Sequence, residues 1–211
     1  TFMDGGPSAG DYLDASSGTG ATIAAVGGFA RAHGQKYAPG PLPVLNDGRG
    51  AVGDDDWQGC AWFDRTKIGD RDVEQGRFHI DLQRAVDVSR IATFTWHKGG
   101  RSIQAYDVYG TAAAAPDLGA KDLEANGWTK IASVDTESLG EGDKHGVGIH
   151  KAAGLGAFRH LLFHVRRGGA FFCEVDVFAD RCRAPIDATG PSRQSLLCAL
   201  RGDAGELRIA G

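Results

Sequence analysis

The residues best suited to binding chemistry gather in one short turn, WHKGGR, at positions 96–101. Trp96 supplies a flat apolar face and Arg101 a planar fork of N–H donors, a combination that suits sugars and carboxylates. His97 lies between them and Tyr106 follows, so we predict a ligand site at these four residues. The alternative is structural: Trp96 would alternate with Phe94 as a core residue, while His97 and Arg101 brace the turn.

Other catalytic or metal-binding patterns are weaker. His160 and His164 lie on one predicted strand, about 13 Å apart, which is too far for them to share one ion. The acidic run 54–56 is typical of a solvated loop. No GxSxG, HExxH or Walker pattern occurs. Paired carboxylates for glycoside hydrolysis come from distant strands, and the sequence selects none.

The turn joins two of three strands that we predict between Arg77 and Gly110. Phe78, Ile80 and Leu82 alternate with polar residues, as in a strand with one buried face. A second apolar run covers 88–96 and a third covers 103–109. The candidate site therefore lies where the second strand turns into the third.

Further strands are predicted over 22–29, 57–64, 128–134, 158–166 and 170–178. Long loops are expected over 37–56 and 135–156, and helix propensity is appreciable only within 112–126. Many short strands, glycine-rich turns and almost no helix favour an all-β fold, an antiparallel β-sandwich of the jelly-roll kind. We expect this sandwich to span 1–182, with 183–211 as an appendage or the start of a following domain.

Composition excludes some partners. A net charge of −4 gives no electrostatic basis for binding nucleic acid. No apolar run approaches the ~20 residues of a membrane span. Residues 1–18 lack the basic start and apolar core of a signal peptide, so an exported form would have lost its signal already. The four cysteines form no CxxC pair, which argues against a zinc knuckle. They allow two disulfides, with Cys182–Cys198 the easier pair, or four buried thiols.

Several short motifs occur in an order that resembles a known family. They are Leu45-Asn46-Asp47-Gly48, Phe78-His79-Ile80-Asp81-Leu82, Asn126-Gly127-Trp128-Thr129, Arg159-His160-Leu161 and Phe172-Cys173-Glu174-Val175. Over about residues 40–180 the chain resembles a galactose-binding-domain-like jelly roll, the group of discoidin or coagulation-factor type C domains and many carbohydrate-binding modules. It departs from the family after Gly48, where Arg49-Gly50-Ala51 replaces the usual Thr-x-Trp.

The resemblance implies a structural calcium ion at the Asp-Gly loop. Asp47 and Glu174 would supply side chains, and the backbone carbonyls of Leu45 and of Arg49 or Gly50 would complete the oxygen ligands that calcium requires. The alternative is that Asp47 only stabilises an Asx-turn and that Glu174 faces solvent.

The resemblance also implies a non-catalytic carbohydrate-binding module of a larger exported protein, secreted or at the cell surface. Its partner would be a glycan or glycoconjugate, held on a rim of loops, and attachment to other domains would raise its effective concentration. The alternatives are a polysaccharide lyase or hydrolase on the same scaffold and a protein-binding adhesion module, because a fold does not determine function.

Overall fold

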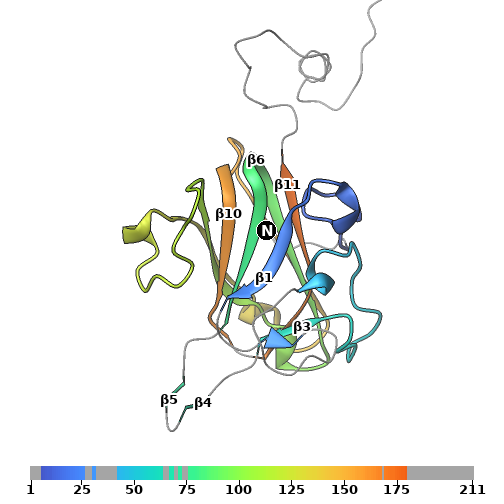
Figure 1. Ribbon diagram of the computed structural model, residues 1–211. Coiled ribbons are helices and arrows are strands. Elements are labelled where there is room, and N and C mark those ends of the chain that lie inside the picture. The colour runs from blue at the N-terminus through green and yellow to red at the C-terminus, as the bar shows by residue number, and fades with distance from the viewer. Residues whose placement is uncertain are drawn as a thin grey trace, which may run out of the picture.

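The described part of the chain is built from antiparallel strands joined by loops and single turns of 3-10 helix (Figure 1). A computed structural model describes residues 6–26, 30–31, 42–63, 67–68, 71–72, 76–167 and 169–179. The strands are β1 (Thr22–Val26), β2 (Ala30–Arg31), β3 (Ala61–Phe63), β4 (Lys67–Ile68), β5 (Arg71–Asp72), β6 (Arg77–Trp96), β7 (Ala105–Thr111), β8 (Thr129–Asp135), β9 (Lys144–His150), β10 (Gly156–Val165) and β11 (Ala170–Ala179). The 3-10 turns are η1 (Ala15–Ser17), η2 (Pro43–Leu45), η3 (Gly100–Ser102), η4 (Glu124–Asn126) and η5 (Glu137–Leu139).

The long strand β6 organises the molecule. It pairs with β1 up to Asp81 and with β10 up to Val88, and its last part, from Val88 to Trp96, pairs with β9 and β11. Near its middle Gln83 adopts a positive φ of 68°, so the strand changes direction without ending. The sequence predicts two separate strands over this segment. That prediction is wrong, because the polar middle of β6 stays extended as the chain passes from one layer to the other.

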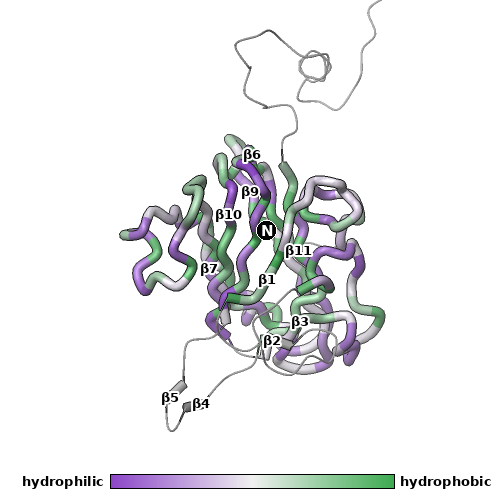
Figure 2. The backbone as a smooth tube through the Cα atoms, viewed as in Figure 1, coloured by the Kyte–Doolittle hydropathy of each residue, from purple (hydrophilic) through white to green (hydrophobic). Residues whose placement is uncertain are grey.

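The two parts of β6 enclose one core. Phe78, on the first part, stacks on Phe163 of β10 at 4.4 Å between ring centroids. Its edge also meets Phe172 of β11, a strand of the other layer, at 5.8 Å. All three side chains are fully buried. The two layers therefore face each other, and the predicted antiparallel β-sandwich is confirmed. Figure 2 shows hydrophobic colouring along β1 and β11.

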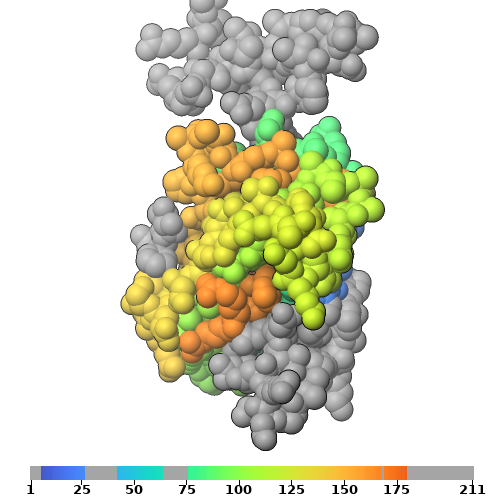
Figure 3. Space-filling model, turned by 90° about the vertical axis from the view of Figure 1, so that its left-hand side faces the viewer, coloured from blue at the N-terminus to red at the C-terminus, as the bar shows by residue number. Residues whose placement is uncertain are grey.

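Two segments differ from what the sequence predicts. The expected loop 135–156 contains β9, which pairs along the last part of β6 despite the glycines Gly146 and Gly148. This strand is set by its partner, since its own sequence has low strand propensity. The stretch 112–126 forms only the short turn η4 and covers the outside of one layer, where Leu123 and Trp128 pack on Leu162 (Figure 3).

The boundary between 182 and 183, and Cys182 and Cys198 with it, lie outside the described residues. Within the described ranges, no helix has the length and apolar character needed to cross a bilayer.

Candidate functional site

His97 braces the turn in which it was predicted to bind a ligand. Its side chain is buried, and its Nδ1 accepts the backbone N–H of Gly99 at 3.0 Å. Its Nε2 lies 3.5 Å from Oδ1 of Asp55, and its ring packs on Phe171 at 4.9 Å. Burial, with the charge of Arg101 nearby, lowers the pKa of His97. A ring held by these contacts positions the turn.

The acidic run 54–56 is not simply solvated. The carbonyl of Asp54 accepts the backbone N–H of Lys98 at 2.8 Å, and Asp55 forms an ion pair with the Lys98 ammonium. Asp56 accepts the backbone N–H groups of Val52 at 3.0 Å and Gly59 at 3.1 Å. These contacts fasten loop 52–59 to the end of β6, so that two segments far apart in sequence form one rim.

Arg101 forms an exposed cationic edge of this rim. Its guanidinium carbon lies 5.0 Å from the centre of the Trp62 ring and 5.3 Å from that of Phe171. The two rings are 5.6 Å apart and belong to neighbouring strands, β3 and β11. A guanidinium over aromatic rings gains cation–π attraction and keeps its N–H donors available at the surface.

Trp96 lies between the rim and a pocket and forms part of the pocket lining. The Lys144 ammonium lies 4.1 Å from the centre of its ring, because the two residues are cross-strand partners on β6 and β9. Next along the same face, Phe94 lies opposite Gly146, whose missing side chain leaves room above the sheet. The pocket has a volume of about 300 Å³, at the lower end of small-molecule sites. Its lining residues are Gly6, Pro7, Gly50, Ala51, Phe94, Thr95, Trp96, Asp143, Lys144, His145, Gly146 and Cys173.

Tyr106 does not belong to this site. It is fully buried between the layers, and its hydroxyl lies 2.8 Å from Oγ1 of Thr93. Burial raises its pKa. The alternation of β7 points Tyr106 and Val108 inward, whereas Asp107 points outward, and a residue this deep cannot reach a ligand on the rim. The prediction for Tyr106 is therefore wrong.

The residues expected at a calcium site do come together in part. The backbone N–H of Arg49 donates to Oδ1 of Asp47 at 2.9 Å and to Oε2 of Glu174 at 3.2 Å. Leu45 ends the turn η2, which packs beside β11 and carries the loop to Glu174. The Asx-turn at Asp47 is present, but Glu174 is fully buried and does not face solvent.

A β-bulge explains the position of Glu174. The pairing of β11 with β6 shifts between Phe172 and Glu174, which turns Glu174 to the outside of the sheet while Phe172 and Val175 remain in the core. Burial, together with the charges of Asp47 and Asp176, raises the pKa of Glu174 to about 10.

Three further acids lie near Asp47 and Glu174 and form one acidic cluster with them. These three were not predicted from the sequence. Asp11, Asp14 and Asp176 are at most 3% exposed. Each has one carboxylate oxygen that is buried without a hydrogen-bond partner in the described part of the chain. Burial raises the pKa of Asp11 to about 6 and that of Asp176 to about 7. They meet because Asp11 accepts the backbone N–H of Val177 at 2.8 Å and Asp176 accepts that of Ser8 at 3.0 Å.

This acidic cluster offers many oxygen atoms and little positive charge. Its chemistry therefore suits a hard cation. Nevertheless, no three His, Cys, Asp or Glu side chains among the described residues are arranged to hold a metal ion by themselves. A calcium ion here would draw on Asp47 and Glu174 and take its remaining ligands from backbone carbonyls and water.

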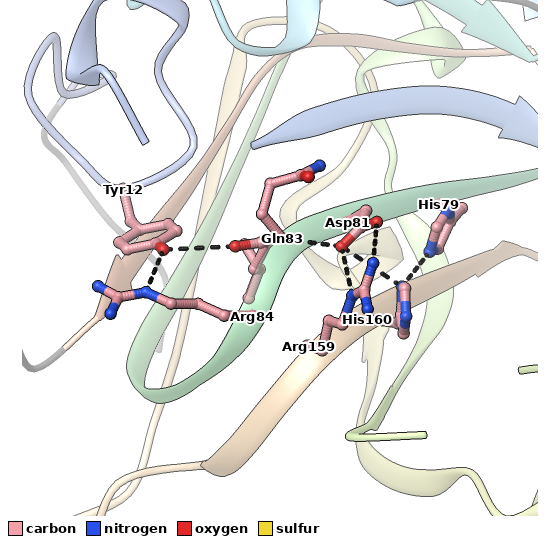
Figure 4. A network of polar contacts seen from close by, with 8 residues as sticks. Tyr12, His79, Asp81, Gln83, Arg84, Arg159 and His160 are labelled. Carbon is pink, nitrogen blue, oxygen red and sulfur yellow. Dashed lines mark hydrogen bonds and ion pairs between the residues drawn. The ribbon is translucent and has the colours of Figure 1, made fainter. Parts of the chain in front are cut away.

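Two histidines form a separate polar cluster between β6 and β10 (Figure 4). Nε2 of His79 lies 2.9 Å from Nδ1 of His160, and His160 also lies beside the carboxylate of Asp81. Arg159 donates to both carboxylate oxygens of Asp81, each at 3.1 Å. Burial and the neighbouring His160 lower the pKa of His79 to about 4. His164 lies farther along β10, opposite Arg77 rather than His79.

Comparison with known proteins gives structural matches only. No protein-family model and no curated protein match the chain. The family 32 carbohydrate-binding module of NanJ from Clostridium perfringens, in complex with galactose, is 18% identical at a TM-score of 0.46, covering 74% of this chain and 92% of that one. CpGH89CBM32-5 from the same organism, in complex with GalNAc-β-1,3-galactose, is 14% identical at 0.44, covering 75% and 95%. A mutant of the lectin-binding domain of lectinolysin, complexed with Lewis b, is 14% identical at 0.45, covering 83% and 99%.

Proposed function

We propose that this chain is a non-catalytic carbohydrate-binding module whose glycan ligand occupies the pocket beside Trp96 and extends toward Arg101. The observation that supports this most strongly is the pocket itself, because it joins an aromatic wall to fixed charged groups. A sugar ring enters beside the Trp96 wall, where the Lys144 ammonium lies over the indole, and its hydroxyl groups bond to Lys144 and Asp143. His97 and Asp55 hold the adjoining turn in place, so binding needs little rearrangement.

The position of the buried acids favours binding over hydrolysis. Glycoside hydrolysis needs two carboxyl groups on either side of the scissile bond. Of the described residues, Asp143 alone brings a carboxyl group to the pocket lining. The buried acids with raised pKa values do not line it; they are Asp11, Asp14, Glu174 and Asp176. A substrate in this pocket would therefore meet one carboxylate.

Calcium has a structural role in this proposal. The ion is held by Asp47 and Glu174 with backbone carbonyls of loop 45–50, as expected from the sequence. It would stabilise the ionised form of a glutamate that is fully buried beside two other acids. Since Gly50 lines the pocket, a calcium-stiffened loop also steadies one wall of the glycan site.

The proposed module works as part of a larger exported protein, secreted or at the cell surface. A pocket of about 300 Å³ contacts little more than one sugar unit, so we expect weak binding by the isolated module. Attachment to a neighbouring domain would raise its effective concentration on a glycan surface.

A glycan array tests the proposal directly. The chain is applied with calcium and with a chelator, beside Arg101→Ala and the control Arg90→Ala, in which the arginine removed packs on Phe178. We expect a restricted set of glycans to bind, and binding to fall for Arg101→Ala but not for Arg90→Ala. An array on which the wild-type chain binds no glycan contradicts the proposal.

A further inference from the structure

Two cysteines face each other under the aromatic rim. Sγ of Cys60 lies 3.4 Å from Sγ of Cys173, both residues are buried, and both are free thiols. They share a small apolar cluster with Phe171, and with Trp62 and Trp96 packed against it. Since 113 positions of sequence separate the two, their meeting is a result of the fold.

The backbone geometry suits a covalent bond. In the antiparallel pairing of β3 with β11, Ala61 lies opposite Phe172, so the next position brings Cys60 opposite Cys173. Directly opposed residues of antiparallel strands have Cα atoms about 4.5 or 5.5 Å apart. A disulfide accepts Cα separations of about 4.4–6.8 Å and an S–S length of about 2.0 Å, so small side-chain rotations close the remaining gap.

The two thiols differ in chemical character. The Cys60 thiol donates to the sulfur of Cys173, which lowers the pKa of Cys173 and raises that of Cys60. Cys173 also lines the pocket beside Trp96, whereas Cys60 is not part of that lining. Cys173 is therefore the one of the two cysteines that borders the pocket, and its lowered pKa makes it the better nucleophile.

We propose that Cys60 and Cys173 are a disulfide-forming pair that reacts with small-molecule disulfides such as oxidised glutathione. The thiolate of Cys173 attacks one glutathione sulfur, forming a mixed disulfide and releasing one glutathione thiolate. Cys60 then gives up its proton to solvent, and its sulfur displaces the second glutathione from Cys173. Two protein thiols are oxidised to one disulfide, and one glutathione disulfide is reduced to two thiols.

The bond would fasten an edge of the sandwich. Strand β3 has three residues and is held to the rest of the sheet through β11. A link between β3 and β11 closes a long loop of chain, which reduces the conformational freedom of the unfolded state. It also fixes the position of Trp62 in β3, which lies two positions after Cys60 and has the Arg101 guanidinium over its ring.

Thiol counting in the full chain tests the proposal. The variant Cys182→Ser/Cys198→Ser removes the other cysteines of the sequence, and oxidised glutathione is then added. We expect free thiols in the unfolded protein to fall from two per chain to none, with a mass-mapped peptide linking Cys60 to Cys173. The melting temperature should rise by about 5–10 °C and return to its initial value with dithiothreitol.

Cys60→Ser in the same background is the control. It should bind one glutathione and show no rise in melting temperature. Two thiols that persist, or two glutathione adducts without a link, would overturn the proposal. Peptide mapping of the oxidised wild-type chain gives the same decision if a serine variant fails to fold. All of these readouts are independent of glycan binding.

Discussion

The backbone N–H of Arg49 donates to the fully buried carboxylate of Glu174 at 3.2 Å, joining a loop and a strand 125 positions apart. The same N–H donates to Asp47. Two acids thus converge on one amide group, and burial with the neighbouring charges raises the pKa of Glu174 to about 10. Because these acids are buried side by side, we expect the stability of the sandwich to depend on pH and on bound cations.

Calcium should stabilise the chain through this pair of acids. At a calcium concentration 100 times its Kd, binding contributes about 2.7 kcal/mol, which corresponds to a rise of about 5–10 °C in melting temperature. Glu174→Gln should abolish the rise, while the exposed Glu124→Gln should retain it. Thermal melts with calcium and with a chelator measure the effect. An equal rise in Glu174→Gln and wild type would contradict the assignment of Glu174.

Without divalent cations, stability should fall as the pH rises. The pKa values of Asp11 and Asp176 are raised by burial to about 6 and about 7, so the folded state binds protons that the unfolded state has released. Their contribution is complete below about pH 4 and is lost as the pH rises to about 7. Asp176→Asn should flatten this dependence by about 1–3 kcal/mol in urea titrations with chelator. An unchanged slope in Asp176→Asn would refute this explanation.

The histidine pair should act in the opposite direction. Burial, the neighbouring His160 ring and the Arg159 guanidinium outweigh Asp81 and lower the pKa of His79 to about 4, so the folded state favours the neutral ring. Stability from this group is present above about pH 6.5 and is lost as the pH falls to about 4.

Urea titrations between pH 4 and 7 measure this contribution. The wild type should lose about 1–3 kcal/mol more than His79→Gln over that range, because the variant has no titrating ring at position 79. The exposed Lys151→Gln is the surface control and should behave as wild type. Equal losses in wild type and His79→Gln would show that the pair does not titrate as described.

Tyr106→Phe separates stability from binding. The change removes the hydroxyl that bonds to Thr93 in the core, and we expect a loss of about 0.5–1.5 kcal/mol in the free energy of unfolding. Glycan affinity should not change, because Tyr106 is fully buried. A loss of affinity without a loss of stability would show that Tyr106 does contribute to ligand binding.

Local patterns were sufficient to predict strands that are rich in apolar and aromatic residues, such as β10 and β11. They failed for β9, whose strand conformation depends on pairing with β6. They also divided β6 in two, because a strand that crosses between layers changes its buried face partway along.

The candidate site shows the same limit. The turn that contains Trp96 and Arg101 was visible in the sequence because its residues are adjacent. Lys144 and Asp143 were missed because they reach the pocket only through the pairing of β9 with β6. Tyr106 was misplaced because β7 carries apolar residues on both faces, so the pattern of apolar residues did not show which face is buried.

Isothermal titration calorimetry with the best glycan from the array tests the central claim most directly. Trp96→Ala removes the aromatic wall of the pocket, and Trp57→Ala removes a tryptophan that is 56% exposed and lies outside the lining. We predict at least a tenfold loss of affinity for Trp96→Ala and less than a twofold change for Trp57→Ala, and both variants should remain folded under the conditions of the titration. Wild-type affinity in a folded Trp96→Ala would contradict glycan binding in this pocket.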